Sequence, residues 1–348
     1  KDSLIKIDKY GRYFAQFADS YEEIVTIETE LYIAKVSRQG GSLIEFRLKD
    51  YTQWNDYPTQ LIWSNDPEQK GQLFLTFMTK EAKKIDSRDL YFDFVDLEKR
   101  NIKIGGNKSF TLVARLSVEN GKYIEKKFKF YGDKYIFDTE VKLYNLNDVL
   151  TTRGYNFVWS DGLKYQERST VDESSNANAM VMLNDELVEV DATDPELEEE
   201  TVTGLVDYAG IKIKYFGVGI IPNGKKKFDG TVDVSGYSQN VKRDGMVERY
   251  NISYRIPYMG GENIQKFRVF LGPLDYDIVS QYGLQKMVYF GWWIIRYIGE
   301  FIILPMFLFI HQFIQSWGIT LIVFAIIMKL LLYPLSIQQM KTSQRMKL

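Results

Sequence analysis

The sequence predicts a mostly β protein, in which a large antiparallel β-sandwich precedes an apolar helical region near the carboxyl end. Three observations support this fold class. Short segments of alternating apolar and polar residues recur as far as about residue 270, which is typical of strands with one buried face. Turn residues, including an Asn-Gly pair, separate these segments. Beyond residue 286 the alternation gives way to long apolar stretches.

The alternating segments predict the individual strands. Residues Leu43–Leu48 alternate strictly, and a second run, Phe110–Val118, leads through Asn120-Gly121 into a strand over Tyr123–Tyr131. Asn-Gly between two such runs is the strongest short signal for a hairpin. Further strands are expected at Tyr135–Leu143, Ile211–Ile221, Gly230–Val234, Tyr250–Ile256 and Gln265–Leu271. Many strands with turns between them and few helical stretches favour a sandwich of two sheets.

Two loops are expected between the strands. In Arg38–Ser42 the paired glycines supply the backbone conformations of a turn. Residues 185–200 are rich in Asp and Glu and contain Pro195, which predicts a solvated loop; a metal or partner site is the less favoured alternative. The carboxylates lack the spacing of a calcium loop, so neither a metal site nor a cofactor is predicted.

Composition excludes several classes of function. The net charge of the 348 residues is −2, which argues against a nucleic-acid partner. Cysteine is absent, so neither disulfides nor thiolate chemistry are expected. The one histidine, His311, lies in the apolar carboxyl-terminal region, where an interfacial polar residue at a helix end is its expected role. Imidazole catalysis in the β-rich part is therefore excluded, and the chain is not expected to be an enzyme.

A membrane-spanning helix is predicted near the carboxyl end. The window Phe313–Leu335 is long enough, at 1.5 Å per residue, to cross about 30 Å of hydrocarbon. Trp317 and Tyr333 lie near its two ends, where amphipathic rings favour the membrane interface, and Pro334 is expected to end the helix. Between residues 319 and 332 the only charged residue is Lys329.

The charges around this helix predict its orientation. The tail 336–348 contains Lys341, Arg345 and Lys347 but no acidic residue, so it is expected in the cytoplasm, with the preceding chain on the outer side. Two interpretations of Lys329 remain open. Its side chain either extends along the helix to the cytoplasmic headgroups or faces a water-containing cavity in the membrane.

The apolar stretch 287–314 is predicted to lie in the membrane interface as an amphipathic helix. Arg296 and Glu300 are spaced i, i+4 and therefore share one helical face, and Trp292 and Trp293 lie close by. A second membrane crossing is the alternative that hydropathy allows. Two crossings would return the chain to its starting side, however, which conflicts with a large outer domain and a positive tail.

These residues resemble a known family. The run Ser316-Trp317-Gly318-Ile-Thr and the run Met328-Lys329-Leu-Leu-Leu-Tyr333-Pro334-Leu-Ser resemble the first core helix of the YidC-type membrane protein insertases. In that family a basic residue, usually arginine, precedes a Tyr-Pro-Leu turn by four positions and lies in a hydrophilic groove. Lys329 matches this position but lacks the planar guanidinium, so a role that rests on charge is retained and one that needs bidentate contacts is not.

The resemblance extends through the β-rich part. Glu30–Ile44 is similar to the opening strand and Gly-Gly turn of YidC periplasmic domains, Lys214–Pro222 to their Tyr-Phe…Ile-Pro strand, and Phe270–Pro273 to their Gly-Pro exit. It implies a β-supersandwich related to carbohydrate-binding folds. The expected divisions are a periplasmic domain (1–272), a connector (273–286), an interfacial helix (287–314), a transmembrane helix (315–335) and the start of a cytoplasmic region (336–348).

The function implied by the resemblance is insertion of membrane proteins without nucleotide, alone or with the Sec translocon, in the bacterial inner membrane. Nascent membrane proteins and the lipid bilayer are the expected partners, and the resemblance leaves the Sec translocon and the ribosome open as others. The family's groove needs five helices, so we expect four more beyond Leu348. Because Lys1 follows no signal peptide, an N-terminal signal or anchor is also expected.

Two alternatives to an insertase remain. The first is a membrane-anchored carbohydrate-binding β-sandwich, for which Trp54, Trp63 and Trp159 are candidate ring platforms, although core packing explains buried tryptophans more often. An epimerase version would need histidine, which residues 1–286 lack. The second is a passive tethered domain, in which Lys329→Leu would have no phenotype.

Overall fold

The computed structural model describes residues 2–63, 71–224, 228–242, 245–288, 299–314 and 316–345. In the last helix it describes side chains as far as Leu330 and at Tyr333. The chain divides into two compact units, Lys1–Met287 and Val288–Leu348. The first unit contains the β-sandwich and the second contains helices, which agrees with the predicted fold class.

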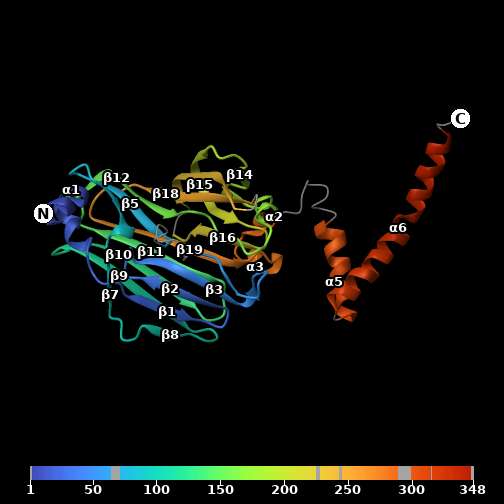
Figure 1. Cartoon of the computed structure of the whole chain (residues 1–348), viewed down its shortest axis with the longest axis horizontal. Coiled ribbons are helices and arrows are strands. Elements are labelled where there is room, and N and C mark those ends of the chain that lie inside the picture. Colours follow the sequence, from blue (N-terminus) through green and yellow to red (C-terminus); the bar gives the residue numbers. More distant parts are fainter. Residues whose placement is uncertain are drawn as a thin grey trace. The chain divides into compact units, whose positions relative to one another are not determined.

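Within the described residues, the strands of the first unit form a five-stranded and a 14-stranded sheet (Figure 1). The pairings are antiparallel, except that β1 and β8 are parallel. The smaller sheet has the order β4-β3-β2-β1-β8. Its strands are β1 (Ile24–Glu28), β2 (Tyr32–Ser37), β3 (Ser42–Thr52), β4 (Pro58–Gln60) and β8 (Asn101–Lys103).

The larger sheet has the order β6-β5-β12-β18-β17-β15-β16-β19-β11-β10-β9-β7, and β13 and β14 branch from it at β15. Its strands are β5 (Phe74–Thr79), β6 (Lys84–Asp86), β7 (Asp93–Val95), β9 (Ser109–Glu119), β10 (Lys122–Tyr131), β11 (Ile136–Tyr144), β12 (Leu150–Trp159), β13 (Asn178–Leu183), β14 (Glu186–Val190), β15 (Glu198–Lys212), β16 (Phe216–Pro222), β17 (Phe228–Val241), β18 (Gly245–Ile256) and β19 (Glu262–Pro273).

Aromatic contacts join the layers of the sandwich. Phe46 of the smaller sheet lies with its ring centroid 6.3 Å from that of Phe137 in the larger one. Within the larger sheet, Phe157 of β12 stacks on Phe267 of β19 at 4.6 Å, so strands far apart in the sheet order face each other across the core. All four side chains are fully buried, so their packing contributes to the hydrophobic stabilisation of the core.

Short helices lie at the ends of the sheets: α1 (Asp2–Phe14), η1 (Ala15–Phe17), η2 (Ser87–Asp89), α2 (Thr170–Ser174), α3 (Tyr276–Ser280) and η3 (Gln285–Met287). The helix α1 differs from the prediction, in which the amino-terminal residues belong to the β-rich region. Phe14, at the end of α1, is fully buried and packs on Phe77 of β5 at 5.2 Å. Packing of this apolar side chain therefore attaches α1 to the sandwich.

The predicted hairpin after Phe110–Val118 is confirmed. In β9 the side chains of Leu112, Ala114, Leu116 and Val118 are buried, whereas the residues between them are not. Gly121 adopts a φ of 71°, and Glu119 pairs with Lys122 across the turn. The positive φ explains the glycine, because residues with a Cβ rarely adopt it.

Three predicted segments differ from the structure. Ile211–Ile221 is not one strand, because β15 ends at Lys212 and β16 begins at Phe216, so the segment folds back on itself. The predicted acidic loop 185–200 is not a single loop, because it contains β14 and the start of β15; the acidic residues of these strand segments are exposed or half-buried. In β3, a bulge at Ile44 separates Leu43, which pairs with Val36, from Glu45, which pairs with Lys35.

The second unit contains a π-helical turn, η4 (Gly299–Ile303), followed by α5 (Leu304–Phe313) and α6 (Trp317–Arg345). The helices α5 and α6 form a hairpin around residues 314–316 (Figure 1). Over the part of the chain that the structure describes, no helix combines enough length with enough apolar character to cross a membrane.

Candidate functional site in the helical hairpin

The start of α6 is held against α5 by ring stacking. The Trp317 ring stacks on His311 with 3.5 Å between centroids and an interplanar angle of 14°, and on Phe307 at 6.0 Å. Phe307 also contacts Phe324, two turns further along α6, at 5.5 Å. Gly318 is open: a Cβ at this position would meet no atom within 4 Å. Of the predicted motif at this end, the structure therefore gives packing contacts to Trp317 and none to Gly318.

A buried threonine joins the two helices and was missed from the sequence. Thr320 is fully buried, and its hydroxyl lies 3.2 Å from Nδ1 of His311. The same hydroxyl lies 2.9 Å from the carbonyl oxygen of Ser316 and 3.1 Å from that of Ile314, close to the turn. The hydroxyl has one hydrogen to donate, and the carbonyl oxygens of Ser316 and Ile314 both lie within reach of it, so this polar group is satisfied within an apolar helix.

Lys329 projects from an apolar part of α6. Its side chain is exposed, as are those of Ile326 and Leu330, which are 55% and 68% exposed. The sequence of α6, Trp317–Arg345, contains no acidic residue, so no carboxylate on this helix can neutralise the ammonium. Tyr333, predicted at the membrane interface, is 61% exposed. The helix thus presents one cation among large apolar side chains.

The prediction that the helix ends at Pro334 is wrong. The helix α6 continues through this position to Arg345. Proline removes one backbone donor and crowds the carbonyl four residues earlier, but a helix can pass through it when the remaining hydrogen bonds are kept. The basic tail therefore begins as an extension of the same helix.

The predicted interfacial residues lie mostly outside the described structure. Trp292, Trp293 and Arg296 are outside the described residues, and Glu300 is described only as part of the backbone of η4. The predicted charged face therefore stays a prediction. In α5, the described side chains of Leu308, Phe309 and Phe313 are exposed, and the helix is apolar except near His311.

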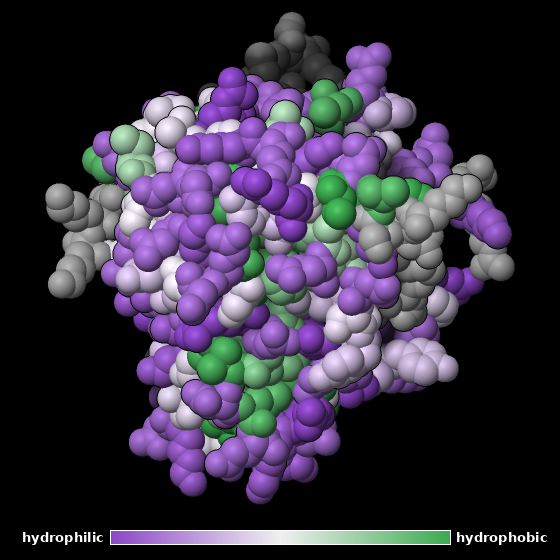
Figure 2. Space-filling view, turned by 90° about the vertical axis from the view of Figure 1, so that its left-hand side faces the viewer, coloured by the Kyte–Doolittle hydropathy of each residue, from purple (hydrophilic) through white to green (hydrophobic). Residues whose placement is uncertain are grey.

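Large apolar side chains cover the described surface of this unit. A helix that exposes apolar residues around its circumference needs lipid or protein to cover it. By contrast, hydrophilic residues predominate on the face of the first unit that Figure 2 shows, and they surround an apolar patch. The exposed apolar residues of α6 are Trp317, Ile319, Leu321, Ile322, Ile326, Leu330 and Tyr333.

The three candidate ring platforms differ in exposure. Trp159 is fully buried, and its Nε1 donates to the carbonyl oxygen of Gly162 at 3.0 Å, so it serves the core. The guanidinium of Arg249 covers the Trp63 ring at 3.9 Å. Trp54 alone of these three is exposed, at 56%. Trp54 is therefore the most accessible of the three rings, although the guanidinium of Arg168 lies 5.8 Å from its centroid.

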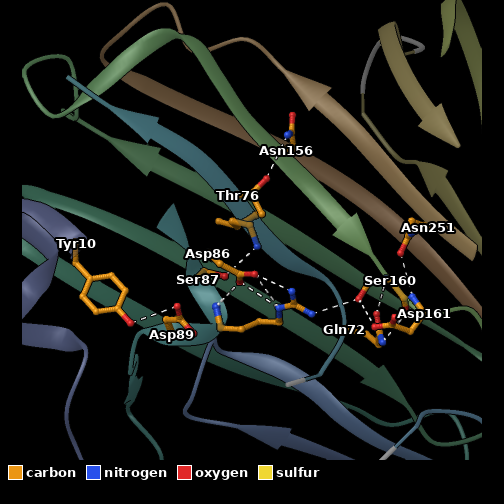
Figure 3. A network of polar contacts seen from close by, with 12 residues as sticks. Tyr10, Gln72, Thr76, Asp86, Ser87, Asp89, Asn156, Ser160, Asp161 and Asn251 are labelled. Carbon is orange, nitrogen blue, oxygen red and sulfur yellow. Dashed lines mark hydrogen bonds and ion pairs between the residues drawn. The ribbon is translucent and has the colours of Figure 1, made fainter. Parts of the chain in front are cut away.

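A polar network lies around Ser160, directly after β12 of the larger sheet (Figure 3). Arg88 donates to both carboxylate oxygens of Asp86 and, at 3.3 Å, to the hydroxyl of Ser160. Gln72 and Ser160 exchange two hydrogen bonds of 2.9 and 2.8 Å. Asp161 donates its backbone N–H to the Asn251 side chain. Because these groups are hydrogen-bonded to one another, we interpret the network as a structural one that stabilises the fold. The described residues contain no carboxylate or histidine cluster that could hold a metal ion.

The fold and the helical hairpin define a class of protein, namely a β-sandwich domain followed by apolar helices whose exposed side chains need lipid or protein to cover them. The family model of the YidC periplasmic domain matches residues 24–309. The chain therefore belongs to this family, which confirms the predicted resemblance and the prediction that the chain is not an enzyme.

Curated relatives extend the match over nearly the whole chain. The membrane protein insertase YidC of Chlorobium limicola is 32% identical over 350 aligned residues, which cover 99% of this chain and 58% of the relative. The protein of the same name from Pelodictyon phaeoclathratiforme is 34% identical and is covered to the same extents. The chain thus spans somewhat more than half the length of these relatives.

Among solved structures, similarity is more distant. A putative aldose 1-epimerase from Escherichia coli K12 aligns with 72% of this chain and 99% of its own, at 9% identity and a TM-score of 0.42. A galactose mutarotase related enzyme from Lactobacillus acidophilus aligns with 72% of this chain at a TM-score of 0.41.

Proposed function

We propose that this chain is part of a membrane protein insertase of the inner membrane. The observation that carries the proposal is its membership in the YidC family, together with relatives that are named membrane protein insertases. The proposed activity is insertion of nascent membrane proteins, without nucleotide and either alone or with the Sec translocon. The lipid bilayer and the inserted protein are the proposed partners.

In this proposal residues 315–335 cross the bilayer, with the β-sandwich in the periplasm and the residues after about 335 in the cytoplasm. The sequence supports the crossing through the apolar window 313–335. The exposed apolar side chains along the first turns of α6 support it too, since they require cover. The window includes residues 331, 332, 334 and 335, whose side chains lie outside the described structure.

Lys329 supplies the positive charge of the proposed groove. An ammonium without a carboxylate on its own helix is costly in lipid, so water or a polar client segment must reach it. A hydrated cation there lowers the cost of bringing an acidic or polar segment partway across, because unmatched charge in hydrocarbon is unfavourable. This role rests on charge and not on guanidinium geometry.

The test replaces Lys329 in the full-length protein that contains this chain. Lys329→Ala and Lys329→Glu are expected to impair insertion of a small single-span substrate in cells depleted of their own insertase. Lys329→Arg is the matched control, because it keeps the charge, and is expected to support insertion. If all three variants restore insertion equally well, the proposed role of Lys329 in the groove is contradicted.

Topology can be tested in the same protein, since its residues 1–348 contain no cysteine. Single cysteines at Thr52 and Ser343 are expected to react with a membrane-impermeant maleimide from opposite sides of the inner membrane. Labelling of both positions from the same side would contradict the proposed crossing.

A further inference from the structure

A polar pocket of about 370 Å³ lies at the β4 edge of the smaller sheet. It is lined by Glu45 and Arg47 of β3, by Gln60 of β4, by Asn55 and Tyr57 of the β3–β4 loop, and by Lys164. In the sheet register Arg47 is opposite Gln60, so their side chains lie on the same face. The pocket lies wholly in the first unit and is independent of the helical hairpin.

Gln60 lines this pocket and carries a buried donor without a hydrogen-bond partner among the described residues. Its side chain is only 8% exposed, and Oε1 accepts a hydrogen bond of 2.9 Å from the backbone N–H of Phe46. This contact fixes the orientation of the amide, because the opposite orientation would place two donors together. Nε2 consequently remains a buried donor, and among the described residues it has no hydrogen-bond partner. Such a group favours a ligand that offers an acceptor.

The segments that line the pocket beside Gln60 are held in place by hydrogen bonds to backbone groups. Nε2 of Gln166 donates to the carbonyl oxygen of Gln60 at 2.8 Å and to that of Lys164. The backbone N–H of Lys164 donates to Leu61 at 3.0 Å, and that of Trp54 donates to Gln166 at 3.3 Å. Gln166 thus joins β4, the β3–β4 loop and the Lys164 segment. A pocket fixed in this way binds without first having to be ordered.

The charges in the pocket favour an anion. Lys164 is half-buried, and burial lowers the pKa of its ammonium, which contacts no carboxylate among the described residues. Nε of Arg47 lies 3.9 Å from Oε1 of Glu45, but Glu45 also binds Lys35 at 2.8 Å. One carboxylate is therefore shared by two cations, and Lys164 adds a third positive charge. Binding of an anion would favour the charged form of Lys164.

We propose that this pocket binds an oxyanion, a carboxylate or a phosphate group of a polar ligand. The amide N–H of Gln60, the guanidinium of Arg47 and the ammonium of Lys164 donate to the anion. The combination of a guanidinium and an ammonium suits both groups, since each presents several acceptor oxygens. Asn55 and Tyr57 contact the remainder of the ligand, and the exposed ring of Trp54 lies on the same loop.

Isothermal titration of the whole chain in detergent tests this proposal, with inorganic phosphate and acetate as probes at constant ionic strength. Saturable binding of either anion is expected, and the tighter of the two identifies the recognised group. Gln60→Glu is expected to weaken binding tenfold or more. The glutamate can still accept from Phe46, but it replaces the N–H donor by an acceptor and adds a negative charge.

Lys127→Gln is the matched control, because it changes the net charge by the same amount on β10, where Lys127 pairs with Glu140 and does not line this pocket. It is expected to bind like the unmodified chain. If Gln60→Glu lowers the thermal unfolding temperature, Lys164→Met tests the same prediction, because within the part of the chain that the structure describes this ammonium contacts no carboxylate that the substitution would leave unpaired. Absence of saturable binding of both anions, or equal affinity of the unmodified chain and the Lys164→Met variant, would overturn the proposal.

Discussion

The ammonium of Lys126 lies 2.5 Å from the carbonyl oxygen of Gly41 and 3.1 Å from that of Gly40. Lys126 belongs to β10 of the larger sheet, and the glycines form the turn between β2 and β3 of the smaller one. Both glycines have positive φ, 74° and 49°, and their turn presents its carbonyl oxygens to the lysine. The side chain is fully buried, so this contact joins the two layers inside the core.

Burial lowers the pKa of Lys126 to about 7, although Asp86 opposes the shift. The unfolded chain holds this proton up to about pH 10.5, so between pH 7 and 10.5 the unfolded state binds more protons than the folded state. We therefore expect the contribution of Lys126 to the free energy of unfolding to rise with pH across this window, by at most about 1.4 kcal/mol per pH unit. Below pH 7 the contribution is constant.

Urea unfolding of the unmodified chain and of Lys126→Met at pH 6, 7, 8 and 9 measures this slope. The difference in unfolding free energy between them should be constant from pH 6 to 7 and should then change in favour of the unmodified chain. Lys35→Met is a suitable control, because Lys35 is only partly buried in its pair with Glu45. A difference that does not change from pH 7 to 9 would show that Lys126 keeps its proton in the folded state.

Glu173 has the opposite dependence on pH. It is fully buried, and desolvation raises its pKa to about 7, although the backbone N–H groups of Gln166 and Glu167 donate to Oε2. The folded state then binds more protons than the unfolded state between about pH 4.5 and 7. We expect the stability to fall across this window by about 1 to 3 kcal/mol and to be constant above it.

Glu173→Gln should remove this loss, since an amide oxygen still accepts from both N–H groups and carries no charge. We expect the variant to be more stable than the unmodified chain at pH 8 and to differ little at pH 4.5, as measured by urea unfolding. Part of the fall in unfolding free energy between pH 4.5 and 7 should persist in this variant, because burial also raises the pKa of Glu248 to about 7. Glu199→Gln, at an exposed position of β15, should leave the slope unchanged. An identical slope in Glu173→Gln would contradict the assignment.

The strands that the sequence predicts well are those whose alternation is complete. Residues 110–118 and the Asn120-Gly121 turn combine periodicity with a turn signal, and both signals are local. The prediction of one strand over Ile211–Ile221 fails because both arms of this short hairpin are buried, and the turn at residues 213–215 contains none of the Gly, Pro, Asn or Asp residues that usually indicate a turn. The helix α1 is attached by the burial of Phe14, a tertiary contact that leaves no periodic signal.

The residues of the candidate sites also differ in how far the sequence predicts them. Lys329 stands out in the sequence because one charge interrupts an apolar run, and its exposure on α6 follows from helix geometry. Thr320 and Gln60 carry no such signal. Thr320 matters through His311 on another helix, and Gln60 through an amide fixed by Phe46 on the adjacent strand. Contacts between elements decide both roles, and a single sequence does not encode them in its spacing.

Arg38 fixes the segment before β1 to β7 through its planar guanidinium. It donates to the carbonyl oxygens of Phe92 and Tyr21, to the Ser20 hydroxyl and to Asp93, and it is 9% exposed. Arg38→Lys keeps the charge but loses the fork of donors, so we expect a loss of about 2 kcal/mol in the free energy of unfolding.

Arg100→Lys is the control for Arg38, because the Arg100 side chain is 60% exposed and makes one ion pair with Glu23, which an exposed lysine can also make. A surface pair of this kind contributes about 0 to 1 kcal/mol, so little change is expected. Both variants can be compared by chemical unfolding in the same buffer. If they lose similar amounts, the stabilisation comes from charge alone and not from the arrangement of donors.

The packing of α5 against α6 can be tested in the whole chain through the contact of Phe307 with Phe324, because both residues belong to the second unit. Their ring centroids are 5.5 Å apart, and Trp317 packs on the same Phe307 ring. In the cysteine-free chain, we expect a short bifunctional thiol reagent to join Phe307→Cys and Phe324→Cys, with altered mobility on a denaturing gel. Phe309 is 63% exposed and contacts Phe313 instead, so a cysteine at 309 should react poorly with one at 324. Equal cross-linking of both pairs would mean that α5 rotates freely against α6, because stacking on Trp317 permits only one face of α5 to meet the helix that carries Lys329.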